Sequence, residues 1–205
     1  SRNNSYQMTL RFLANYKKRF GDNHDLALLY GMEQISYRNY YSMAQRKDLI
    51  SDALPDVSLG SAGSQFAEGY PTKWGINSFF GRVNYTFKDW MAFDLTLRHD
   101  RSSRFGKNHQ GATFFSVGGM YDIYRTHFKD LKWMSTFRFK ANYGTQGNSS
   151  IPLYASEAMT GIINYTNELA FGVTSIGNED LTWESQGMLS VGIDYGMWED
   201  RLSVG

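Results

Sequence analysis

Hydrophobic and polar residues alternate with a period of two along most of the chain, the pattern of β-strands with one apolar and one polar face. Between positions 6 and 20, the even positions are mainly apolar and aromatic, while the odd positions are mainly polar or basic. The alternation recurs farther along and predicts strands at 6–20, 26–43, 76–87, 91–100, 113–124, 132–144 and 188–195, with a last strand starting near 201. Segment 145–181 has no clear period, and we expect a long loop there.

The connections between the predicted strands alternate in length. Short turns are expected at 21–24, 88–90, 125–131 and 198–200, and longer loops at 45–75, 101–112 and 145–182. The short turns therefore gather at one end of the sheet and the long loops at the other. Outer-membrane β-barrels have this asymmetry, with short periplasmic turns and long extracellular loops. Several predicted strands also exceed the roughly 9–11 tilted residues that are needed to cross a bilayer.

The composition also favours long β-strands. Aromatic residues make up 16% of the 205 residues, and 20 glycines stand against 3 prolines, which suits strands joined by tight turns. A mean hydropathy of −0.48 and the lack of a long apolar run exclude a transmembrane helix, but not a membrane β-barrel, whose alternating strands average to a polar value. We predict an all-β fold, an antiparallel transmembrane β-barrel segment that supplies about eight strands of a larger barrel.

Two other architectures remain open. A soluble, secreted β-sandwich that binds glycans also alternates apolar and polar positions, and a passive porin has the same strand pattern as an active importer. Two features favour a membrane barrel over the sandwich. Charged residues recur in mid-strand on the polar face, and tyrosine, phenylalanine and tryptophan gather near strand ends on the apolar face, as in an interfacial aromatic girdle.

Charge and motifs argue against several other classes. The net charge is +1, which gives no argument for a nucleic-acid partner, and the basic residues among aromatics at 11–20 and 138–143 follow the strand alternation. Cysteine is absent, which excludes disulfides and thiolate metal sites. The four histidines lie in different connections without ligand spacing, and no nucleophile-elbow motif occurs. We therefore expect neither an enzyme nor a metal or cofactor site.

Five short motifs follow one another along the chain. They are S-F-F-G-R-V-N-Y at 78–85, L-R-H-D-R-S-S-R-F-G at 97–106, N-Y-G-T-Q-G-N at 142–148, N-E-D-L-T-W-E at 178–184 and V-G-I-D-Y-G at 191–196. In this order they resemble SusC/RagA-type TonB-dependent outer-membrane transporters of the Bacteroidota, over residues 76 to 205. Four residues depart from the family's pattern: Arg101 replaces a glycine, Phe115 and Glu179 replace prolines, and Gln146 replaces a threonine.

The resemblance implies a barrel of about 22 strands with a plugged lumen. Residues 1–205 would all belong to this single barrel domain, as a fragment from its C-terminal half without plug domain or TonB box. It further implies import of glycans, oligosaccharides or peptides across the outer membrane of a Gram-negative cell. The implied partners are a SusD-like lipoprotein lid, TonB, the protein's own plug, the ligand and outer-membrane lipid.

Candidate site residues follow from the loops and from the polar face. For ligand contact in the long loops we predict aromatic and amide side chains, which stack on sugars or apolar groups and pair with hydroxyls or amides; these are Tyr70, Trp74, Tyr154, Asn164 and Tyr165. For contact with the lumen or the plug we predict charged residues of the polar face and of the corner after position 100; these are Arg82, Asp94, Arg98, Asp100, Arg104 and Arg138.

Overall fold

The computed structural model describes residues 1–49, 56–165 and 168–205, with the side chains of 162–169 left outside the description. Eight strands form one antiparallel sheet, in the order β1-β2-β3-β4-β5-β6-β9-β10. Their bounds are β1 Arg2–Phe20, β2 His24–Gln45, β3 Phe66–Phe87, β4 Met91–Ser102, β5 Gly111–Asp122, β6 Met134–Asn148, β9 Glu184–Met197 and β10 Leu202–Val204. A separate hairpin of β7 (Met159–Tyr165) and β8 (Glu168–Ser175) lies between β6 and β9 in the chain.

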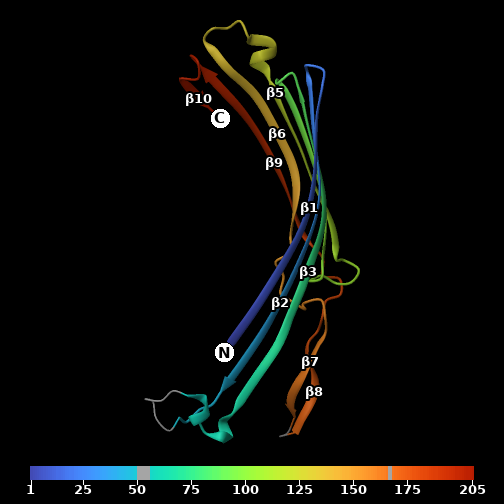
Figure 1. Ribbon diagram of the computed structural model, residues 1–205, viewed down its shortest axis with the longest axis vertical. Coiled ribbons are helices and arrows are strands. Elements are labelled where there is room, and N and C mark those ends of the chain that lie inside the picture. The colour runs from blue at the N-terminus through green and yellow to red at the C-terminus, as the bar shows by residue number, and fades with distance from the viewer. Residues whose placement is uncertain (50–55, 166–167) are drawn as a thin grey trace.

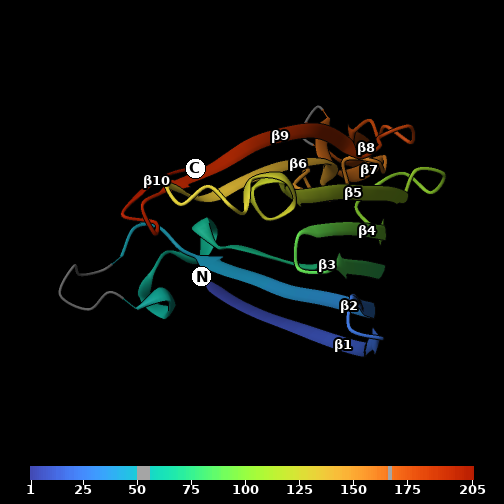
Figure 2. The same cartoon turned by 90° about the horizontal axis from the view of Figure 1, so that it is seen from above.

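Each strand of the large sheet pairs with its neighbour in sequence once this hairpin is set aside. The strands form a single curved layer from β1 to β9 (Figures 1 and 2), and the order ends at β1 on one side and at β10 on the other. The sheet is therefore open within the described residues. The prediction of about eight antiparallel strands is confirmed.

The two ends of the sheet differ as predicted. The connections at 21–23, 88–90 and 198–201, together with the π-helical turn Tyr124–Phe128, lie at the upper end of Figure 1. The longer connections at 46–65, 103–110 and 149–183 lie toward the other end. We call these the short-turn end and the long-loop end. None of the described helical segments is long and apolar enough to cross a membrane.

The strand registers separate the residues into an apolar face and a polar face. Side chains of a strand alternate between faces, and paired positions share a face, so rows can be followed from strand to strand. One row on the apolar face crosses seven strands, through Tyr16, Leu28, Val83, Leu95, Val117, Tyr143 and Leu189. The opposite face carries most of the charge, at Arg11, Lys17, Arg19, Asp25, Glu33, Arg82, Asp94, Arg98, Asp100, Asp122, Arg138, Lys140 and Asp194.

The apolar face is not a packed interior. Leu10 and Phe12 are more than half exposed, as is Leu189, and among the described residues only Phe105, Phe114 and Met134 are buried hydrophobic side chains. In a soluble sandwich this face would be covered by a second sheet. Within the described residues the eight-stranded sheet is a single layer, as in a barrel wall and unlike a sandwich.

Strand β3 begins ten residues earlier than the sequence predicts, at Phe66 rather than at 76. Gly69, Pro71 and Gly75 suggest a loop there, but this part of β3 pairs with β2 alone. The backbone nitrogens of Lys73 and Gly75 point away from β2, since they donate to Tyr154 Oη and Ser103 Oγ. Pro71 has the same parity, so its missing N–H costs no ladder hydrogen bond.

The segment after β6 is also more ordered than expected. Strand β6 continues to Asn148, because Gln146 and Asn148 pair with Gln186 and Glu184 of β9. The hairpin β7–β8 then occupies part of the predicted loop. Its strands have 7 and 8 residues, and the alternation of Leu169, Phe171 and Val173 with smaller residues is confined to β8, which is too short to give segment 145–181 a clear period.

Candidate ligand-binding site

A small aromatic cluster holds the loops together at the long-loop end. Phe105 is 1% exposed, and its ring lies 4.7 Å from that of Trp183, which in turn lies 5.6 Å from the ring of Phe114. The indole nitrogen of Trp183 donates to the carbonyl oxygen of Gln110 at 2.9 Å. These contacts join the corner between β4 and β5 to the segment that precedes β9.

Gly106 makes this docking possible. Its backbone nitrogen donates to the carbonyl oxygen of Leu181 at 3.3 Å, and a Cβ at this position would collide with the carbonyl group of Glu179. Two of the five motifs in the sequence, at 97–106 and 178–184, therefore contact each other directly. Close approach of two backbones is a reason for glycine that does not depend on a positive φ.

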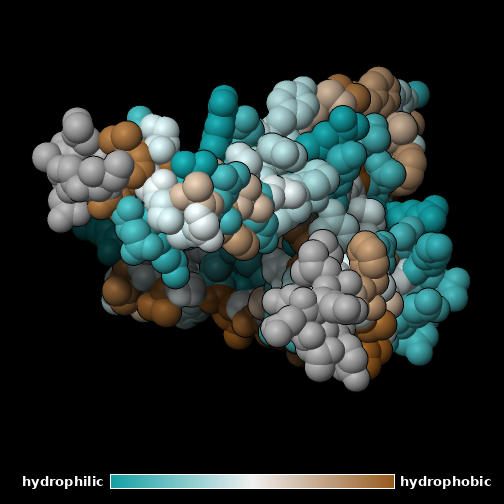
Figure 3. Space-filling view, turned by 90° about the horizontal axis from the view of Figure 1, so that it is seen from below, coloured by the Kyte–Doolittle hydropathy of each residue, from teal (hydrophilic) through white to brown (hydrophobic). Residues whose placement is uncertain are grey.

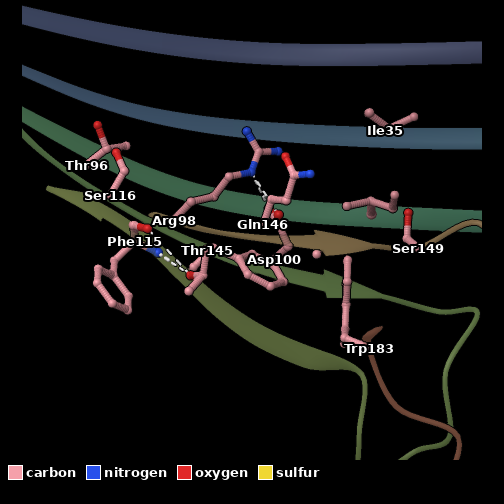
Figure 4. A pocket seen from close by; sticks show the side chains of 13 residues that line it. Ile35, Thr96, Arg98, Asp100, Phe115, Ser116, Thr145, Gln146, Ser149 and Trp183 are labelled. Carbon is pink, nitrogen blue, oxygen red and sulfur yellow. Dashed lines mark hydrogen bonds and ion pairs between the residues drawn. The ribbon is translucent and has the colours of Figure 1, made fainter. Parts of the chain in front are cut away.

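A cavity of about 370 Å³ opens beside the cluster, mainly on the polar face of the sheet (Figure 4). Strands β2 to β6 and the segment before β9 contribute to it. Its lining combines apolar and polar groups: Ile35, Ile76, Thr96, Arg98, Asp100, Phe114, Phe115, Ser116, Thr145, Gln146, Gly147, Ser149 and Trp183. A few polar groups above an apolar floor, in a space of this size, are typical of sites for small ligands.

Arg98 is held in place inside this cavity. Its Nε lies 2.8 Å from both carboxylate oxygens of Asp100, and its Nη2 donates to Ser78 Oγ at 3.0 Å. Glu33 lies 3.9 Å away, and the guanidinium lies 5.4 Å from the centre of the Phe80 ring. Charge-assisted bonds of this kind fix the orientation of both partners, so the wall presents a preorganised polar group.

The remaining polar groups are suited to hydrogen bonding. Gln146 offers an amide, and Thr96 and Ser116 offer hydroxyls, from three neighbouring strands. In Figure 4 the amide of Gln146 lies near the guanidinium of Arg98, with Ile35 and Trp183 farther along the cavity. Within the described residues, no group of three or more His, Cys, Asp or Glu side chains is arranged to hold a metal ion.

Five of the six residues predicted to face a lumen share the polar face. Arg98 and Asp100 line the cavity, Arg138 donates to Asp122 at 3.0 Å, and Asp94 lies beside Gly118. Arg82 is exposed and pairs in register with Thr96. The structure therefore brings Arg98 and Asp100 together, and places the other three along the same wall.

Arg104 and Trp74 form a loop contact of their own. The guanidinium of Arg104 lies 4.3 Å from the centre of the Trp74 ring, and its Nη1 donates to the carbonyl oxygen of Ser149 at 3.2 Å. Trp74 also stacks on Tyr37 at 5.3 Å. Arg104 thus covers the indole that we predicted for ligand stacking, and the pair joins β3 to two loops.

The other predicted ligand contacts are dispersed. Tyr70 is 49% exposed and lies against Tyr41 at 5.3 Å on the polar face. Tyr154 accepts a hydrogen bond from the backbone nitrogen of Lys73 at 3.1 Å. Asn164 and Tyr165 belong to β7 by their backbone, but their side chains lie outside the described residues.

Sequence reasoning did not select the apolar part of the cavity lining. Ile35, Ile76 and Phe114 occupy positions of the polar face, so each interrupts the alternation of its strand. The sequence signal for these residues is an apolar side chain at a position of the polar face. Such a side chain is stabilised there only by a local apolar contact, such as a cavity lining. Trp183 and Gln146 lie in the recognised motifs, but no pattern in the sequence pairs them.

The whole chain, residues 1–205, matches the family described as TonB dependent receptor-like, beta-barrel. It is 29% identical to TonB-dependent receptor P3 of Formosa agariphila, in an alignment that covers 99% of this chain and 21% of that protein. It is 27% identical to TonB-dependent receptor SusC of Bacteroides thetaiotaomicron, over 98% of this chain and 20% of that protein. The chain therefore spans about a fifth of the length of these relatives.

The fold has close counterparts among solved structures. It superimposes on the structure of the RagAB peptide transporter with a TM-score of 0.89 at 37% identity, over 98% of this chain and 23% of that one. For the RagAB peptide importer in the 'open-open' state, the TM-score is 0.87 at 37% identity, over 98% and 22% of the two chains. The similarity includes residues 1–75, which precede the first recognised motif.

Proposed function

The chain belongs to the TonB-dependent receptor β-barrel family, and we propose that it forms part of the wall of a barrel that imports nutrients across the outer membrane. The recognised family and the antiparallel barrel fold agree with the sequence motifs. The open sheet is then a segment of a barrel of about 22 strands, to which this chain supplies eight. All of residues 1–205 would lie in this one barrel domain.

The two faces of the sheet support a definite orientation. The apolar face, with its row from Tyr16 to Leu189, would meet lipid, and the charged face would line the lumen. The long-loop end would lie outside the cell and the short-turn end in the periplasm, as in other outer-membrane barrels. Figure 3 looks onto the long-loop end and shows hydrophilic and hydrophobic residues interspersed, which suits a surface that contacts water and a protein partner.

The partners follow from the family. The plug domain and the segment that contacts TonB would belong to parts of the parent protein outside these 205 residues. On the lumen wall, Arg82 and Lys17 have no carboxylate within 4.0 Å among the described residues, so both are available to the plug. A SusD-like lipoprotein would cover the long-loop end.

The cavity beside Arg98 is the observation that carries the proposal of ligand contact. It lies on the lumen face, near the end from which a nutrient would enter. The ligand that we propose is a peptide, because the Gln146 amide suits a peptide backbone, Phe114 and Trp183 suit apolar side chains, and the solved relatives transport peptides. Import without catalysis is consistent with this lining, which holds hydroxyls, an amide and an Arg–Asp pair.

Binding by the full-length parent protein, purified with its lid, tests this proposal. We expect binding of peptides from a mixed pool, and a loss of roughly three- to tenfold in affinity for Gln146→Ala, the size expected for one hydrogen bond. Gln186→Ala is the matched control, since Gln186 pairs in register with Gln146 but does not line the cavity. If the protein bound oligosaccharides but no peptides, the ligand would be a glycan and not a peptide. If the Gln146→Ala and Gln186→Ala variants bound peptides equally well, the cavity would not be part of the ligand-binding site.

A further inference from the structure

A second depression, on the opposite face of the sheet, is not explained by ligand import. It has a volume of about 560 Å³ and crosses strands β1 to β4. We call it the boundary groove; its lining is Leu10, Arg11, Phe12, Met32, Glu33, Gln34, Asn77, Ser78, Phe79, His99 and Arg101. By strand parity all of these except Arg11, Glu33 and Ser78 project from the apolar face.

The groove lies where the apolar face becomes polar. One row of paired positions runs through Phe12, Met32, Phe79 and His99, and the next row toward the long-loop end runs through Leu10, Gln34, Asn77 and Arg101. Three of the four side chains are therefore apolar in the row nearer the short turns, and three of the four are polar in the row nearer the long loops. If the apolar face meets lipid, as the proposed function requires, the groove lies at the outer boundary of the membrane.

The charge on this part of the face has one sign. Arg38 and Lys73 form a cross-strand pair two rows beyond Arg101, about 13 Å along the strands. At the positions of this face in β1 to β4 that lie beyond the apolar band, the charged residues are Arg2, Arg38, Lys73 and Arg101, and none is acidic. Like charges opposite each other destabilise a sheet, so such an arrangement favours an anion at this surface.

The polar face offers a direct contrast. There, Arg11 pairs with Glu33, Arg19 with Asp25, Arg98 with Asp100, Arg138 with Asp122 and Lys140 with Asp194. Among the described residues, no carboxylate lies within 4.0 Å of Arg38, Lys73 or Arg101. Five cations of the polar face therefore have carboxylate partners, while Arg82 and Lys17 of that face have none within the described part of the chain. At the edge of the apolar face, none of the three cations has a carboxylate partner among the described residues.

Arg101 is positioned to receive an anion. It is exposed, and within the described part of the chain its side chain makes one hydrogen bond, from Nε to Gln110 Oε1 at 3.1 Å. That bond holds the guanidinium through Nε, while both of its NH₂ groups have no hydrogen-bond partner among the described residues, and the residue lines the groove. His99, beside it, contacts Thr113 Oγ1 through Nδ1 at 3.0 Å. A guanidinium fork matches the geometry of a phosphate group.

We propose that the boundary groove binds a lipid whose headgroup carries a phosphate. The phosphate contacts Arg101, with Arg38 and Lys73 strengthening the attraction, and an acyl chain lies along Phe79, Met32 and Phe12. This assignment explains Arg101, which replaces the glycine of the family's corner motif. A glycine there would remove the cation and leave the groove without its phosphate-binding group.

Native mass spectrometry of the full-length parent protein in neutral detergent tests this inference. The probes are lipid A with its phosphates, the same lipid after enzymatic dephosphorylation, and inorganic phosphate. We expect retention of phosphorylated lipid A by the wild type, loss of about tenfold for Arg101→Gln, the size of a charge-assisted hydrogen bond, and no retention of inorganic phosphate. A further loss is expected when Arg38→Gln and Lys73→Gln are combined with it.

Arg82→Gln is the matched control, because Arg82 projects from the polar face. This variant should retain the lipid as the wild type does. Equal retention by wild type and Arg101→Gln, or of lipid A with and without phosphate, overturns the inference. Peptide binding by the same preparations is measured in parallel. If peptide binding persists in Arg101→Gln, the lipid site and the peptide site are independent. A failure of the lipid proposal would then leave the proposed import function intact, and the reverse also holds.

Discussion

Gly106 determines how closely two loops approach at the long-loop end. Its backbone N–H donates a hydrogen bond to the carbonyl oxygen of Leu181, and the carbonyl group of Glu179 occupies the space that a side chain would need. The stacking of Phe105 on Trp183 depends on that approach, as does the wall of the cavity that Trp183 lines. The addition of one methyl group at this position is therefore expected to alter the proposed ligand site.

We predict that Gly106→Ala displaces the 178–184 segment and destabilises the loop cluster by about 1–3 kcal/mol, the usual range for an overpacked site. Limited proteolysis of the full-length barrel measures the effect, as faster cleavage within 149–183. Gly192→Ala is the control, since a Cβ at Gly192 meets nothing within 4 Å. Equal cleavage rates for the two variants would show that the segment adapts to the methyl group.

At the scale of strands, alternation predicts most of the sheet because each strand has one face toward an apolar medium and one toward polar groups. The start of β3 was missed because proline and glycine usually mark loops. Pro71 is tolerated in this strand because its backbone nitrogen points away from β2, so no hydrogen bond between the strands is lost. The hairpin β7–β8 was missed because it is short: Leu169, Phe171 and Val173 alternate with small residues over only a few positions, within a segment that has no clear period as a whole.

The candidate site was predictable only in part. Arg98 is predictable as a charged residue in mid-strand, and Asp100 as a charged residue on the same polar face. Phe114 and Ile76 were missed because their contribution depends on the register of neighbouring strands, which sequence alone does not supply. Trp74 was selected as an aromatic loop residue, whereas the position of Arg104 over its ring depends on contacts between distant segments.

The assignment of faces gives a prediction for β4. Leu95 lies in the row through Val83 and Val117, so Leu95→Arg would place a cation near the middle of the apolar band. Transfer of that cation into lipid would destabilise the folded barrel by about 2–4 kcal/mol. We expect reduced assembly in the outer membrane, measured as the fraction of heat-modifiable, folded protein on a gel.

Asn142→Arg is the matched control for that variant. Asn142 projects from the polar face near Asp94, on either side of Gly118, so the new cation gains a carboxylate neighbour and assembly should be close to that of the wild type. If Asn142→Arg impaired assembly and Leu95→Arg did not, the two faces would be assigned the wrong way round.

At the scale of the whole molecule, the sheet is an incomplete wall. It leaves its apolar face exposed, and its strand order is open between β1 and β10, whereas a membrane requires that strand edges be closed. The curated relatives are about five times as long, so we infer that neighbouring strands of the parent barrel satisfy both edges. The variants are therefore to be tested in the full-length parent protein.

Cysteine labelling in intact cells tests whether this wall crosses the outer membrane with its long loops outside. The 205 residues contain no cysteine, so Lys107→Cys at the long-loop end and Asp89→Cys in a short turn are compared with the unsubstituted parent. Both positions are exposed. With a membrane-impermeant thiol reagent, we predict labelling at 107 in intact cells and at 89 only after the outer membrane is permeabilised. Labelling at 89 but not at 107 would reverse the proposed orientation, and equal labelling of both in a fraction that is soluble without detergent would contradict a place in the membrane.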